Sequence, residues 1–135
     1  MCGIFGYIGH QQALPILVEG LRRLEYRGYD STGVAVEHDG TIQTHKTVGK
    51  VADLKAILPE HVPGTLGIAH TRWATHGGVT QVNTHPHPSY DGRVHLVHNG
   101  IIENFQQLRK GLAARGVESV SYTHLTAADD LIGVD

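Results

Sequence analysis

The feature that most constrains the fold is a pair of alternating segments joined by a two-residue turn. Apolar and polar residues alternate over 33–38 and again over 41–46, and Asp39-Gly40 lies between the two segments. Asp-Gly is typical of the tight turn whose twist matches two antiparallel strands. The sequence therefore predicts a β-hairpin, and with it an antiparallel sheet.

The other elements are predicted from the spacing of their apolar residues. Residues 12–24 have apolar side chains at helical spacing, at Leu14, Leu17, Val18 and Leu21. Two further helices are predicted over 51–58 and 104–115. Further strands are predicted over 2–8, 65–70 and 93–98. Helices packed on a mainly antiparallel sheet give an α+β fold.

A long loop with no hydrophobic period is predicted over 71–92. It is rich in Thr, His, Gly and Pro. Loops of this length inside a compact domain are commonly functional or disordered. We therefore expect part of the functional site here.

Size and charge exclude several classes of protein. The 135 residues suit one domain, and a formal net charge of −2 gives no electrostatic reason to expect nucleic acid as a partner. The apolar runs are far shorter than the roughly 20 residues needed to cross a bilayer. No secretory signal follows Met1, so we expect a cytoplasmic protein. One cysteine excludes an internal disulfide and any multi-cysteine metal site.

That single cysteine stands second in the chain. Removal of Met1 would leave Cys2 with a thiol and a free α-amine, whose unperturbed pKa of about 7.7–8.0 makes it an available base near neutral pH. One residue would then supply both a nucleophile and its base. A lone cysteine is also often a small apolar residue of a strand, and its position alone does not decide between these interpretations.

Five motifs resemble class II glutamine amidotransferases, in the order expected for that family. They are 1–6 (MCGIFG), 24–31 (LEYRGYDS), 67–77 (GIAHTRWATHG), 82–88 (VNTHPHP) and 98–104 (HNGIIEN). The resemblance covers residues 1–119 and is to the branch that transfers ammonia to fructose 6-phosphate. It implies the N-terminal-nucleophile αββα sandwich, here the N-terminal part of one amidotransferase domain and therefore incomplete.

The resemblance implies a role for seven residues. Cys2 would attack the glutamine side-chain amide, with Asn99 and Gly100 forming the oxyanion hole. Arg72 would hold the glutamine α-carboxylate through two parallel hydrogen bonds. The residues that would line the glutamine pocket are Trp73, Thr75 and His76. The family needs no metal and no cofactor for this hydrolysis.

The resemblance fails near the end of the chain. Where the family has an aspartate for the glutamine α-ammonium, this sequence has His124, which cannot supply a fixed negative charge. We expect residues 120–135 to be an atypical tail that is not native family sequence. We also expect the 135-residue chain alone to have little or no activity.

Two alternatives stay open at this point. One is the glutaminase domain of another class II amidotransferase, such as a phosphoribosyl amidotransferase. The other is an inactive binding module built on the His-rich loop, where His85 and His87 share a face if the segment is extended. The expected partners are L-glutamine and, through domains absent from this chain, fructose 6-phosphate. No nucleic acid or membrane is expected as a partner, and the parent enzyme is expected to be a homo-oligomer.

Overall fold

The structure is a computed structural model that describes residues 2–73 and 78–117. Its elements in chain order are β1 (Gly3–Ile8), α1 (Ala13–Leu24), a 3₁₀ turn (Glu25–Arg27), β2 (Ser31–His38), β3 (Thr41–Val48), α2 (Val51–Ile57), β4 (Leu66–Arg72), β5 (His87–Pro88), β6 (His95–Leu96) and α3 (Phe105–Ala114). None of the helices in these ranges is both long and apolar enough to span a membrane.

Four strands form one antiparallel sheet in the order β1-β4-β2-β3. The predicted hairpin is confirmed as β2 and β3, with His38 paired to Thr41 across the turn. Asp39 and Gly40 both have positive φ, 49° and 78°, as a type I′ turn requires. The β2–β3 pairing is therefore set by turn chemistry that the sequence displays.

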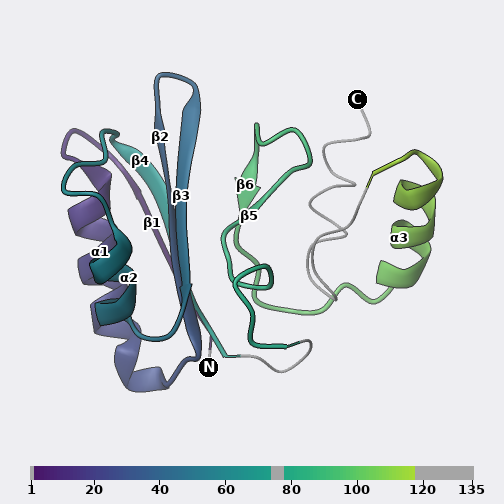
Figure 1. Ribbon diagram of the computed structural model, residues 1–135, viewed down its shortest axis with the longest axis horizontal. Coiled ribbons are helices and arrows are strands. Elements are labelled where there is room, and N and C mark those ends of the chain that lie inside the picture. Colours follow the sequence, from purple (N-terminus) through teal and green to yellow (C-terminus); the bar gives the residue numbers. More distant parts are fainter. Residues whose placement is uncertain (1, 74–77, 118–135) are drawn as a thin grey trace.

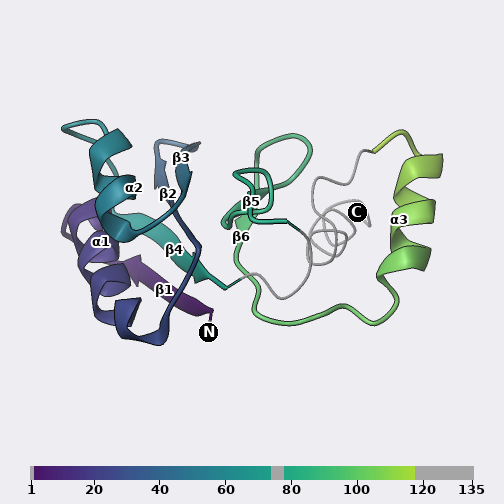
Figure 2. The same cartoon turned by 60° about the horizontal axis from the view of Figure 1, so that its bottom comes forward.

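Helices α1 and α2 cover one face of this sheet, and both views show them together on that side (Figures 1 and 2). Their inward side chains meet those of the sheet in one hydrophobic core. The buried members of the core are Ala13, Leu14, Leu17, Leu21, Val34, Val36, Val51, Leu54, Val62 and Ala69. Each fully buried leucine contributes roughly 1.5–3 kcal/mol by removal from water, so this layer provides much of the stability.

The second face of the sheet is covered over part of its area by the segment that contains β5 and β6 (Figure 1). Farther along this face Ile8 is 79% exposed and its cross-strand partner Leu66 is 39% exposed. Helix α3 lies at the far end of the molecule from α1 and α2 in both views (Figures 1 and 2). Within the described residues, the architecture is thus a helix layer, a sheet and a partial covering of its other face.

Most predicted elements are confirmed, and the main differences are in the strands. β2 begins at Ser31 and β3 ends at Val48, so each is two residues longer than the alternating segment that predicted it. β4 extends to Arg72, two residues beyond the predicted strand, because Ser31 of the long β2 pairs with it. The strand predicted over 93–98 shortens to β6. Its partner β5 lies inside the predicted loop and is only two residues long, since Pro86 and Pro88 have no N–H for a longer ladder.

Candidate active site

The register of the sheet brings the N-terminus to the end of β4. Gly3 of β1 pairs with Thr71 of β4, so Cys2 lies beside Arg72 and Trp73 although 70 positions separate Cys2 from Arg72 in the sequence. A buried hydrogen bond from the Gly3 N–H to the Thr71 hydroxyl, at 3.1 Å, fixes this junction. The site is therefore assembled by strand pairing.

The Cys2 thiol is held by the backbone of Trp73. The Trp73 N–H donates to Cys2 Sγ at 3.3 Å, and Sγ lies 3.5 Å from the Trp73 carbonyl oxygen. The thiol thus donates to one backbone group of Trp73 and accepts from another, and together these contacts fix the position of the sulfur.

Asn99 reaches the same site from the segment after β6. Its side-chain Nδ2 donates to the Cys2 carbonyl oxygen at 3.3 Å, and its Oδ1 lies 2.6 Å from His70 Nε2. A pocket of about 240 Å³ opens between these groups. Its lining residues are Cys2, Arg72, Trp73, His85, His98, Asn99, Gly100 and Ile101.

Arg72 is almost fully buried in the wall of this pocket, with 4% of its surface exposed. Its Nη1 donates to the Gly78 carbonyl at 3.2 Å, and Asn83 Nδ2 donates to the same oxygen at 3.0 Å. Its own carbonyl accepts from the Asp30 N–H at 2.8 Å. A buried guanidinium beside a pocket favours an anionic ligand such as a carboxylate.

Trp73 does not belong to the hydrophobic core. Half of its surface is exposed, and its ring lies against Gly28, which the chain places just before β2. Thr75 and His76, the other expected pocket residues, lie outside the described residues. So do His124 and the 120–135 tail.

Three buried histidines, His70, His85 and His87, lie next to one another at the pocket, and His85 lines it. The His70 and His85 rings stack with centroids 4.2 Å apart, and the His85 and His87 rings are also 4.2 Å apart, tilted by 53°. No three His, Cys, Asp or Glu side chains of the described residues are grouped as metal ligands. Sequence reasoning missed His70, although it lies two residues before Arg72 on the same face of a strand.

A second hollow, of about 600 Å³, lies in the helix layer between α1 and α2. Its lining is largely aliphatic, from Leu14, Pro15, Val18, Val51, Leu58 and others. It is larger than the pocket at Cys2 but lies on the other side of the sheet and contains neither Cys2 nor Asn99. The smaller pocket, which contains the Cys2 thiol, is therefore the candidate active site.

No protein-family model matches the chain. Curated relatives do, among them the glutamine–fructose-6-phosphate aminotransferases (isomerizing) of several bacteria. The relative from Gluconobacter oxydans is 53% identical over 139 aligned residues, which include 98% of this chain and 22% of the relative. That from Streptomyces coelicolor is 58% identical over 91% of this chain and 20% of the relative. The chain thus spans about a fifth of the length of the relatives it matches.

Solved structures show the same fold. Glutamine phosphoribosylpyrophosphate amidotransferase from Bacillus subtilis, in complex with ADP and GMP, matches with a TM-score of 0.72 and 29% identity over 87% of this chain and 26% of that one. A structure described as the allosteric regulatory enzyme of purine biosynthesis matches with a TM-score of 0.74 and 30% identity over the same shares.

The α+β fold and these likenesses define an N-terminal-nucleophile glutamine amidotransferase. Sequence identity then separates the branches of this class, because it is 50–58% to the fructose-6-phosphate enzymes and 29–30% to the two solved structures. The chain belongs to the glutamine–fructose-6-phosphate aminotransferase family and matches about a fifth of the length of its members.

Proposed function

We propose that this chain provides the glutamine-hydrolysing site of an enzyme that transfers the released ammonia to fructose 6-phosphate. The observation that supports it best is that the Cys2 thiol, the Asn99 amide and the Arg72 guanidinium meet at one pocket. These three groups suit attack on an amide, stabilisation of the resulting oxyanion and binding of an amino-acid carboxylate.

Before the reaction, removal of Met1 frees the Cys2 α-amine. That amine takes the thiol proton, and the thiolate attacks the side-chain amide carbon of glutamine. The tetrahedral oxyanion accepts hydrogen bonds from Asn99 Nδ2 and the Gly100 N–H, and each such donor is worth about 2.7–4 kcal/mol. The ammonium of Cys2 returns its proton to the leaving nitrogen, so that ammonia departs and a glutamyl thioester remains. Water then hydrolyses the thioester to glutamate and regenerates the thiol.

Glutamine is held at its other end. Arg72 binds the α-carboxylate in exchange for its contact with the Gly78 carbonyl. Trp73 lines the pocket around the aliphatic part of the substrate, and the family resemblance assigns the same role to Thr75 and His76. In the sequence, His124 takes the position at which the family has its α-ammonium anchor, so the isolated 135 residues should turn glutamine over slowly or not at all.

We assign the acceptor reaction to the part of the relatives that these 135 residues do not match. A fructose 6-phosphate site is proposed for the full enzyme on the strength of the relatives' names. A homo-oligomeric assembly and a cytoplasmic location are proposed from the sequence and its family resemblance alone.

The test is a chimera in which residues 1–117 replace the corresponding residues of the Streptomyces coelicolor relative. We expect the chimera to lack Met1 by intact mass and to convert glutamine and fructose 6-phosphate to glutamate and glucosamine 6-phosphate. Cys2→Ala should abolish glutamate release. A matched control is Ser89→Ala, a buried residue of similar size that does not line the pocket. Glutamate release that survives Cys2→Ala would disprove the proposed nucleophile.

A further inference from the structure

The orientation of the Asn99 amide is decided by its two neighbours. The Cys2 carbonyl oxygen can only accept a hydrogen bond, so the amide nitrogen must face it, at 3.3 Å. The amide oxygen therefore faces His70 Nε2, at 2.6 Å, and because a carbonyl oxygen can only accept, Nε2 must be the protonated ring nitrogen. This pairing leaves the second Nδ2 hydrogen for a substrate oxygen.

We propose that His70 and His85 are positioning residues that hold the segment 98–100 so that the Asn99 amide presents its nitrogen to the reacting oxygen. The catalytic consequence rests on the proposed function, in which Asn99 stabilises the oxyanion. The structural part, a fixed amide orientation, does not depend on it.

His85 fixes the residue before Asn99. Its Nδ1 lies 3.3 Å from the His98 backbone nitrogen, whose N–H donates to it. This contact requires an unprotonated Nδ1, so the neutral His85 ring carries its proton on Nε2. Two adjacent residues are thus held by two imidazoles, one through its backbone and the other through its side chain.

The two imidazoles support one another. Their rings stack at 4.2 Å with an interplanar angle of 21°, and the exposed fractions of His70 and His85 are 0% and 2%. Water cannot easily replace hydrogen bonds at such depth, and rotation of either ring would break its contact with the segment 98–100.

The sheet makes room for this stack at Gly33. Gly33 lies beside His70 in the β2–β4 register, and the His85 carbonyl oxygen occupies the place that a side chain at position 33 would take. His70 itself is held from both sides by β1 and β2, opposite Ile4 and Gly33. The two stacked rings therefore pack against the centre of the sheet. A rigid element of this kind is the support that a positioned amide needs.

A reversed amide would oppose the reaction. With Oδ1 toward the pocket, Asn99 would place a partial negative charge where the oxyanion develops. Loss of one oxyanion donor typically costs about 10²–10³ in kcat. The His70 contact is thus expected to affect kcat far more than glutamine KM, because the oxyanion exists only after attack.

The first experiment uses the 135-residue chain itself. At pH 8, where an ordinary imidazole is neutral, long-range ¹H–¹⁵N spectra should show His70 and His85 both protonated on Nε2. A coupling across the hydrogen bond should connect His70 Nε2 to the Asn99 side-chain carbonyl carbon. A His70 ring protonated on Nδ1 alone would refute the proposal, whatever the enzymatic activity of the chain.

The second experiment measures kinetics in the chimera with the Streptomyces coelicolor relative. His70→Leu should lower kcat for glutamate release about 100-fold with KM within about threefold, and His70→Gln, whose amide can donate from the position of Nε2, should recover at least a tenth of the activity. Leu54→Ala, a core truncation on the helix side of the sheet, controls for lost stability and should leave kcat per folded molecule unchanged. A His70→Leu variant that keeps wild-type kcat, or a His70→Gln variant that loses as much as His70→Leu, would contradict the positioning role. A wild-type chimera without glutaminase activity would instead count against the proposed function, and the spectra would still decide the orientation of Asn99.

Discussion

The carbonyl oxygen of His85 lies against Gly33. A Cβ atom added at Gly33 would be closer to this oxygen than real Cβ atoms come to their neighbours. This contact joins the centre of the sheet to the segment that carries two of the three neighbouring buried histidines. Since the obstructing atom belongs to the backbone, it cannot turn aside as a side chain would.

Gly33→Ala should therefore displace the 85–87 segment and destabilise the chain. Overpacking of this kind costs about 1–3 kcal/mol, which urea unfolding of the 135-residue chain would measure. The histidine stack should be disturbed together with stability, seen as shifts of the His70 and His85 ring resonances.

Gly111→Ala is the matched control, because Gly111 lies in α3 with no heavy atom within 4 Å of an added Cβ. Alanine in a helix interior is favoured over glycine, so this variant should be stabilised by about 0.5–1 kcal/mol. Equal stability of the two variants would mean that the 85–87 segment moves away from the sheet at little cost.

The local parts of this fold could be predicted from sequence. The β2–β3 hairpin followed from alternation and an Asp-Gly turn, and α1 from the spacing of four apolar residues, since both signals act between residues close in the chain. The end of β4 could not be found in this way. Arg72 was expected in a loop, and it is a strand residue because β2, 41 positions earlier, extends far enough to pair with it.

Sequence motifs named residues that the structure brings together, but they did not indicate which residues support them. Cys2, Arg72, Trp73, Asn99 and Gly100 were named from motifs, and all five line one pocket. His70 lay inside one of those motifs without an assigned role. Its contact with Asn99 depends on a pairing across 29 positions, for which the sequence contains no periodic signal.

Tyr29 links the turn after α1 to the first residue of α2. Its hydroxyl donates to Glu25 Oε1 at 2.7 Å and accepts from the Val51 N–H at 2.9 Å. Tyr29→Phe leaves that N–H without its acceptor, and the expected cost is about 1–3 kcal/mol in urea unfolding. Tyr90→Phe, at a residue that is 67% exposed, should leave the free energy of unfolding unchanged.

The same pair of variants tests alkaline stability. Burial, with the hydrogen bond to Glu25, raises the pKa of Tyr29 to about 12, whereas the unfolded chain ionises near 10. The unfolded state thus loses its proton first, so the contribution of Tyr29 is complete below pH 10 and is lost as the pH rises toward 12. Wild type and Tyr90→Phe should weaken over this range more steeply than Tyr29→Phe. Identical slopes for all three would contradict the raised pKa.

His45 and His95 should make the chain sensitive to acid. Burial lowers the pKa of both imidazoles below 6.5, and for His95 the Lys46 cation adds to the effect. Below pH 6.5 the unfolded chain binds protons that these folded rings do not, so stability falls as the pH falls from 6.5 toward the lowered values. The urea midpoints at pH 7.5 and 5.5 should differ less for the double variant His45→Gln/His95→Gln than for wild type. A double variant with an unchanged difference would assign the acid sensitivity to other groups.

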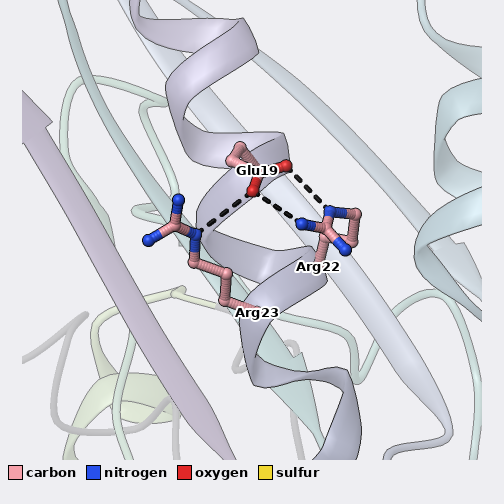
Figure 3. A network of polar contacts seen from close by, with 3 residues as sticks. All are labelled: Glu19, Arg22 and Arg23. Atoms are coloured by element: carbon pink, nitrogen blue, oxygen red, sulfur yellow. Dashed lines mark hydrogen bonds and ion pairs between the residues drawn. The ribbon is translucent and has the colours of Figure 1, made fainter.

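Glu19, Arg22 and Arg23 form an ion-pair network on α1. This network should have a large effect on the pKa of Glu19 and a small one on the free energy of unfolding. Glu19 accepts from Arg22 through two nitrogens, both at 2.8 Å, and from Arg23 at 3.1 Å (Figure 3). These hydrogen bonds lower the pKa of Glu19 to about 2, so any stabilisation is present above the ordinary value and is lost as the pH falls through about 2. All three side chains are solvent-exposed, and water and salt screen such pairs. NMR titration should place Glu19 near 2 in low salt and higher in 1 M NaCl, while Glu19→Gln leaves the urea midpoint nearly unchanged. A titration midpoint near 4.5 in low salt would show that the network does not persist in solution.

Trp73 contributes to the site through its backbone and through its side chain, and substitution tests the two contributions separately. Its N–H holds Cys2 Sγ, and any residue except proline keeps that donor, whereas its half-exposed ring lies at the pocket. Trp73→Ala should therefore change the free energy of unfolding by no more than about 0.5 kcal/mol, as for other surface substitutions. In the chimera, the same variant should raise glutamine KM about tenfold or more, because the proposed site places the ring against the substrate, with kcat reduced much less. Trp73→Phe should recover most of the affinity. If Trp73→Ala lowered kcat at unchanged KM, the ring would instead be acting on the transition state, and its assignment as a binding residue would be wrong.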